Sequence, residues 1–123
     1  MGRFDAEGCA AELCRVFVGW RLQEDHDALV ALGEGALRID LLAGEAWCDG
    51  EPLPPLFIAG ELGRALAAAL ERAGLPAEFV RRAELHAEFA AQPAAGAGPA
   101  LRVACRCALE TADGRFAAEA RRG

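Results

Sequence analysis

The chain has 123 residues, a length that suits one domain, and 54% of them are hydrophobic. Its formal net charge of −6 at pH 7 argues against binding DNA or RNA, because their phosphates need a basic surface. Lysine, serine, tyrosine and asparagine are all missing, which excludes Ser-His-Asp hydrolysis, Schiff-base chemistry and a P-loop.

The N-terminal stretch and the cysteines predict the compartment. Residues 1–8, MGRFDAEG, lack the charged-then-apolar pattern of a signal peptide, and no apolar run approaches the ~18 residues of a membrane span. Five cysteines are an odd count, in a chain that can form a core without disulfides. We therefore expect a cytoplasmic protein with reduced thiols and no membrane partner.

The first third of the chain mixes two periodicities. Cys9 and Leu13 are spaced as on a helix, whereas the run Val16-Phe17-Val18 is typical of a strand. We predict an N-terminal helix within residues 1–14, beginning at Asp5, and then a strand over 15–22.

A polar turn is predicted next, followed by two strands. The turn is EDHD at 24–27, and the strands cover 28–32 and 36–42, interrupted by Gly-Glu-Gly at 33–35. The acidic cluster around His26 could attract a cation, but a solvated turn between strands is the favoured interpretation.

The clearest helix is predicted over 56–73. Between Leu56 and Leu70 its only polar side chains are Glu61 and Arg64, and it ends at a glycine followed by a proline. A helix this apolar is normally surrounded by other structure.

Three antiparallel strands are predicted over 78–121. In the first two, apolar and charged residues alternate, so each strand has one buried and one solvated face. Asp113-Gly114 indicates a hairpin between the last two, and the Gln92–Ala100 segment is expected to be a flexible connection. The whole chain, 1–123, is therefore predicted to be a single α+β domain whose curved antiparallel sheet wraps around one central helix.

This order of elements resembles the hotdog fold, and the sequence before the helix extends the resemblance. Bacterial 3-hydroxyacyl-acyl-carrier-protein dehydratases of this fold carry a motif close to G-H-F-P-G-x-P-x-x-P-G, followed five residues on by a catalytic glutamate. In this chain the frame is AWCDGEPLPPL at 46–56, and Gly50, Pro52, Pro55 and Glu61 match. Trp47 stands at the place of the catalytic histidine, and Cys48 at that of the phenylalanine.

The resemblance implies an acyl-thioester-binding protein that is dehydratase-like. If the chain is catalytic it is a lyase acting on 3-hydroxyacyl thioesters, with Glu61 as acid or base. The implied substrate-binding residues are Trp47, Cys48, Gly50, Pro55 and Phe57. The implied partners are an acyl carrier protein or a coenzyme A thioester and a second copy in a homodimer, with no cofactor and no metal.

Other interpretations of the same residues stay open. Glu61 and Arg64 could form a pair on the helix surface. Cys105 and Cys107 share one strand face, a spacing that can hold a soft metal, but they also fit an apolar core row. The protein could be a non-catalytic partner or scaffold subunit of a hotdog assembly, or an unrelated α+β domain with a structural role.

Overall fold

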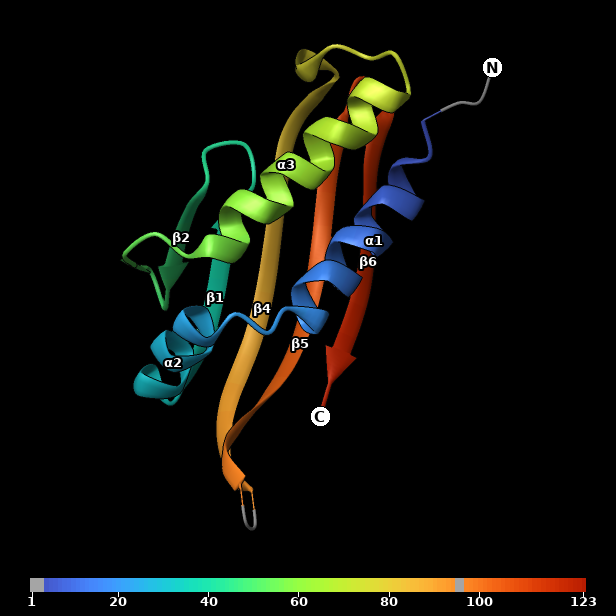
Figure 1. Ribbon diagram of the computed structural model, residues 1–123. Coiled ribbons are helices and arrows are strands. Elements are labelled where there is room, and N and C mark those ends of the chain that lie inside the picture. Colours follow the sequence, from blue (N-terminus) through green and yellow to red (C-terminus); the bar gives the residue numbers. More distant parts are fainter. Residues whose placement is uncertain (1–3, 95–96) are drawn as a thin grey trace.

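The computed structural model describes residues 4–94 and 97–123. It is an α+β fold with one antiparallel sheet of strand order β3-β2-β1-β4-β5-β6 (Figure 1). The strands are β1 (Glu34–Asp40), β2 (Glu45–Cys48), β3 (Glu51–Pro52), β4 (Val80–Ala94), β5 (Ala97–Thr111) and β6 (Gly114–Arg122). The helices are α1 (Ala6–Gly19), α2 (Gln23–Leu32) and α3 (Phe57–Arg72), with a short 3-10 helix at Ala77–Phe79.

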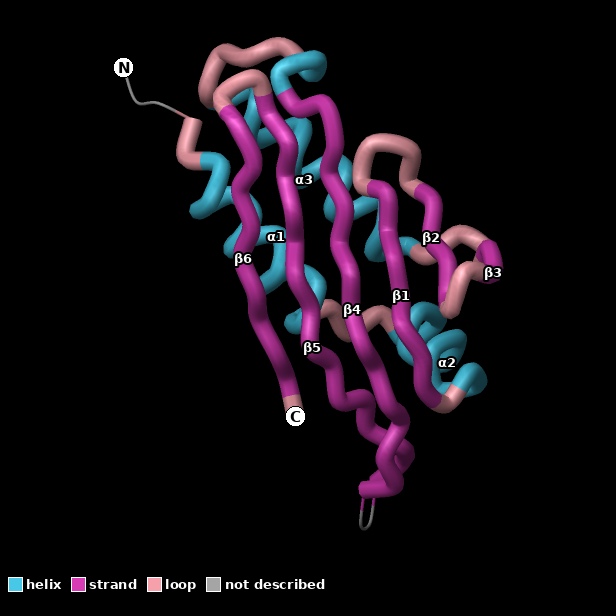
Figure 2. The backbone as a smooth tube through the Cα atoms, turned by 180° about the vertical axis from the view of Figure 1, so that it is seen from behind, coloured by secondary structure: helices cyan, strands magenta, loops and turns pink. Residues whose placement is uncertain are grey.

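All three helices lie on one face of the sheet. Figure 1 shows α1 and α3 crossing the long strands, and Figure 2 shows the opposite face without any helix. The core forms between these two layers. Its fully buried members include Leu13 from α1, Leu62 and Leu66 from α3, and Leu85 and Cys107 from the sheet.

The helix predicted over 56–73 is confirmed as α3. Its C-terminus ends as expected, because Gly74 takes a positive φ of 70° and the backbone N–H of Leu75 donates to Leu70 O at 2.9 Å. The alternation in β4 and β5 and the hairpin before Gly114 are also confirmed. The Gln92–Ala100 segment is not simply a connection, since β4 continues to Ala94 and β5 starts at Ala97; residues 95 and 96 lie outside the described residues.

The picture of one helix enclosed by a curled sheet needs correction. The helical layer contains helices of 14, 10 and 16 residues, and the sheet is open, with β3 at one edge and β6 at the other. α3 is flanked by α1 and not wrapped by strands. The coarser prediction of an α+β domain is therefore confirmed, whereas the hotdog arrangement is not.

Three elements predicted in the first third of the chain are wrong. α1 continues to Gly19, so residues 15–22 do not form a strand; it buries Cys14 and Phe17 against the sheet layer. Burial of this helical stripe outweighs the β-propensity of Val16-Phe17-Val18. The turn at 24–27 and the strand at 28–32 are in fact one helix, α2, which buries Asp25 and Leu29.

Asp25 anchors α3 from a distant part of the chain. Its side chain is almost completely buried and accepts hydrogen bonds from the backbone N–H groups of Phe57 at 3.0 Å and Ile58 at 2.8 Å. It also accepts a hydrogen bond from Trp20 Nε1 at 2.8 Å. Leu56, at the N-cap position, supplies no side-chain cap, so Asp25 satisfies the first free N–H groups of α3.

Two glycines of α3 allow a matched test of how closely the helix approaches the β1–β2 turn. A Cβ at Gly63 would lie 2.8 Å from the backbone oxygen of Leu41, whereas at Gly60 the nearest atom is the mobile end of Arg64 at 3.4 Å. We expect Gly63→Ala to lower the free energy of unfolding by about 1–2 kcal/mol and Gly60→Ala to raise it by about 0.5–1 kcal/mol. Urea unfolding of both variants measures this, and equal stabilisation by both would contradict the close approach.

Candidate functional site

Glu61, the predicted acid or base, lies on the surface of α3. Its carboxylate accepts a hydrogen bond from Arg64 three residues on, and its side chain is 42% exposed. The surface pair considered as an alternative is therefore present. Its contribution to stability is small, a few tenths of a kcal/mol.

The other predicted site residues are not brought to Glu61. Trp47 points to the sheet face without helices, where the guanidinium of Arg38 lies 3.8 Å from its ring centroid. Cys48 points the opposite way and is buried, and Gly50 forms a tight turn with φ of 84°. Pro55 and Phe57 are exposed. The sheet thus separates Trp47 from Glu61, and their catalytic and substrate-binding roles stay predictions.

Cys105 and Cys107 belong to the core between α1 and β5. Burial, together with the neighbouring thiols of Cys14 and Cys9, raises the pKa of Cys107 to about 12. A hydrogen bond with Cys14 and burial also raise the pKa of Cys105, so both groups are protonated thiols at neutral pH. Within the described ranges, no three Cys, His, Asp or Glu side chains are arranged to hold a metal ion.

A groove of about 790 Å³ runs between α1 and α3 on the helical side. We call it the helix groove. Small and apolar side chains from both helices line it: Gly8, Cys9, Leu13, Val16, Ala65, Ala68, Ala69 and Ala73. These side chains do not fill the space between the two helices. Phe4 also lines the groove, and its ring packs edge-on against Phe79 with centroids 5.8 Å apart.

The charged residues of the helix groove lie at its rim. Asp5, Glu12, Glu71 and Arg72 are all exposed, and two of the carboxylates are already engaged. Asp5 caps α1 by accepting from Gly8 N at 2.9 Å, and Glu12 pairs with Arg15. Burial raises the pKa of the Cys9 thiol, although Arg72 lowers it in part, so Cys9 is not an activated nucleophile. The groove can bind an apolar group but lacks a pair of acid and base groups among its described residues.

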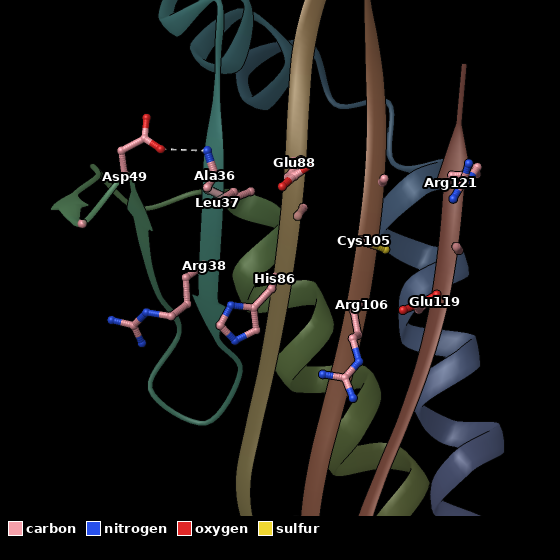
Figure 3. Close-up of a pocket in the computed structure, with 14 residues that line it drawn as sticks. Ala36, Leu37, Arg38, Asp49, His86, Glu88, Cys105, Arg106, Glu119 and Arg121 are labelled. Atoms are coloured by element: carbon pink, nitrogen blue, oxygen red, sulfur yellow. Dashed lines mark hydrogen bonds between the residues drawn. The ribbon is translucent and has the colours of Figure 1, made fainter.

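A second concavity, of about 820 Å³, lies on the opposite face of the sheet. We call it the sheet hollow. Exposed Ala36 and Ala104 form its floor, and longer charged side chains surround it (Figure 3). These are Arg38, Asp49, His86, Glu88, Arg106, Glu119 and Arg121.

Part of the positive charge of this face is neutralised within the molecule. Glu84 accepts from Arg38 Nη1 at 3.4 Å, and its other oxygen lies 3.3 Å from His86 Nε2 and 3.6 Å from Arg82 Nε. The side chain of Glu84 is only 16% exposed, so these contacts persist better than an isolated surface pair would. The face is a mixture of both signs and not a cationic site for an anion.

The fold defines a small α+β protein with a concavity on each face of its sheet layer and, among the residues described, no gathered catalytic groups. Comparison of the chain with protein-family models, with curated proteins and with solved structures gives no significant match. None of the helices in the described part of the chain is both long and apolar enough to cross a membrane.

The helix groove was not predicted, although half of its signal is visible in the sequence. Ala65, Ala68 and Ala69 follow at helical spacing and form a stripe of short side chains, with Arg72 next along the same helix face. The opposite wall could not be predicted, because no local pattern shows that the N-terminal helix packs beside α3.

Proposed function

We propose that this chain is a non-catalytic binding protein that holds an apolar chain, such as the acyl group of a thioester, in the helix groove. The observation that carries the proposal is the distribution of polarity: the walls are apolar or small, and the charged side chains stand at the exposed rim. Ligand sites are typically apolar concavities with a few polar groups that fix orientation.

The dimensions of the groove suit an extended chain. Between Asp5 and Val16 it follows α1 for ~17 Å at 1.5 Å per residue, about the length of a twelve-carbon chain. Arg72 at the rim supplies one cation for a polar end group. Cys9 is held as a protonated thiol, which supports binding over covalent chemistry.

The choice of an acyl thioester rests on the resemblance to the hotdog dehydratases. In that proposal the chain shares their ancestry and keeps an acyl-binding groove beside α3, while the place of the family's histidine holds Trp47. Catalysis at Glu61 is not part of the proposal, since its carboxylate pairs with Arg64 and is not among the residues that line the groove.

Binding of acyl-pantetheine probes of increasing chain length, followed by titration calorimetry, tests the proposal. Each buried methylene contributes about 0.8 kcal/mol, so we expect affinity to rise about three- to fourfold per carbon until the groove is filled. Ala68→Trp should weaken binding at least about tenfold by occupying the groove.

Ala67→Trp is the matched control, because Ala67 is the neighbouring residue, is exposed and does not line the helix groove. It should bind the probes as the unchanged protein does. Affinity that does not depend on chain length, or equal losses in the two tryptophan variants, would contradict the proposal.

A further inference from the structure

The sheet face without helices carries an ordered array of side chains. The strand register aligns them in rows that cross β1, β4, β5 and β6. The middle row is Arg38, His86, Arg106 and Glu119 (Figure 3). The rows on either side each combine two alanines with two charged residues: Ala36, Glu88, Ala104 and Arg121 alternate in one, and Asp40 and Glu84 precede Ala108 and Ala117 in the other.

Several charges of this array have no ion-pair partner in the described part of the chain. Glu88, Arg106, Glu119 and Arg121 are exposed, and none forms an ion pair within 4.0 Å there. Arg106 and Glu119 are cross-strand neighbours in the register, yet their charged groups do not come within ion-pair distance of each other. Two acids and two arginines are therefore free to pair with another molecule.

A two-fold axis parallel to the strands, between β4 and β5, makes this face complementary to itself. Such an axis places β1 of one copy over β6 of the other, and β4 over β5. In the middle row, Arg38 then faces Glu119 of the second copy, while His86 faces Arg106 of the second copy and gains no opposite charge. The next row lies past the Asp40–Glu84 row, where β1 has ended. There Arg82 faces Glu110 of the second copy, because the two residues are register partners on β4 and β5.

The same axis also matches shapes. In the two rows that flank the middle row, each charged side chain faces an alanine of the second copy, so that protruding side chains lie opposite short ones. The facing pairs are Arg121 with Ala36, Glu88 with Ala104, Glu84 with Ala108, and Asp40 with Ala117. Sheets that pack face to face keep their strands within about 30° of each other, so this correspondence holds best near the axis.

An axis perpendicular to the strands gives the opposite result. If it passes through the middle row, Arg38 meets Arg38 and Arg106 meets Arg106 of the second copy, while Glu88 meets Glu84. Like charges set directly opposite each other oppose association. The charge pattern thus opposes a perpendicular axis through the middle row, and the parallel axis is favoured by its match of long side chains with alanines.

The area of the face is sufficient for an interface of moderate strength. Four strands about 4.8 Å apart, each contributing the nine residues of β6 at about 3.4 Å per residue, give roughly 600 Å² per protomer before side-chain relief is added. A standard stable interface buries about 800 Å² per partner.

We propose that the partner of this face is a second copy of the chain, and that the homodimer packs sheet against sheet about a two-fold axis parallel to the strands. The interface is separate from the helix groove, which lies on the other side of the molecule. The dimer buries the sheet hollow and leaves the helix groove open to its ligand.

Sedimentation velocity over a concentration series tests this proposal on the full chain. We expect a reversible dimer with a dissociation constant in the micromolar range, weakened by salt. Arg38→Glu alone and Glu119→Arg alone should each weaken association at least about tenfold, because each variant places two like-charged pairs across the axis. Mixing the two variants should restore dimers, since both pairs are then of opposite charge.

The mixing step separates an interface effect from a folding defect, because a misfolded chain is not rescued by another. Arg15→Glu and Glu12→Arg change the net charge equally on exposed residues of α1, and neither should alter association. A chain that stays monomeric at all concentrations would overturn the proposal and leave this face to another partner. Failure of the mixture to associate, or enhanced pairing of Arg38→Glu with the unchanged protein, would overturn the orientation of the axis.

Discussion

Replacing Asp25 with alanine is expected to lower the free energy of unfolding by about 3 kcal/mol, because one buried and two partly buried donors lose their acceptor. These donors are Trp20 Nε1 and the backbone N–H groups of Phe57 and Ile58. The carboxylate also lies at the N-terminus of α3, where the helix dipole favours negative charge. One side chain thus connects the α1–α2 junction, α2 and the start of α3.

Chemical denaturation monitored by circular dichroism measures this effect. Asp27→Ala is the matched control, since Asp27 is two residues away and exposed, and its carboxylate contacts only Gln23 and His26 of the same helix in the described structure. We expect it to cost about 0.5 kcal/mol or less. Trp20→Phe should cost about 1 kcal/mol and should cost less in the Asp25→Ala background, because the shared hydrogen bond is already lost. Equal losses for Asp25→Ala and Asp27→Ala would contradict the anchoring role.

Leu62→Ala is expected to destabilise the protein by about 3 kcal/mol through the cavity that it leaves between α3 and the sheet. Leu62 is completely buried in the core shared by α3, α1 and the strands. The surrounding side chains come from separate elements and can collapse into the space only in part. The loss should therefore exceed the transfer free energy of the removed atoms alone.

The comparison for Leu62 is Leu42→Ala in the β1–β2 turn. Leu42 is 52% exposed, so the same chemical change should cost about 0.5 kcal/mol or less. Urea titration should show a lower midpoint for Leu62→Ala with an unchanged m value, as expected when stability changes and the unfolded state does not. Similar midpoints for the two variants would contradict the packing of α3 described above.

Residues of the predicted site that are close in sequence lie on opposite sides of the sheet. The frame from Trp47 to Glu61 is continuous in sequence, yet strand alternation sends Trp47 to the face of the sheet that carries no helix. Glu61 lies on a helix across the other face. Nearness in sequence therefore placed two residues in one hypothetical site that the sheet divides. The helix groove depends on residues from two helices some 50 positions apart, and no local pattern joins them.

The sequence by itself determined the elements whose periodicity is dense and unopposed. The apolar run of α3 with its glycine stop, the alternation in β4 and β5, and the Asp113-Gly114 hairpin all follow from local chemistry. The tertiary structure alone decided the helical state of Val16-Phe17-Val18, because burial of Phe17 against the sheet layer outweighs a weak local preference for strand. It alone decided that Asp25 is a buried cap and not a solvated turn residue, since its backbone donors lie 32 and 33 residues further along the chain. It also decided which sheet face stays bare, because that depends on where three helices pack and not on any one of them.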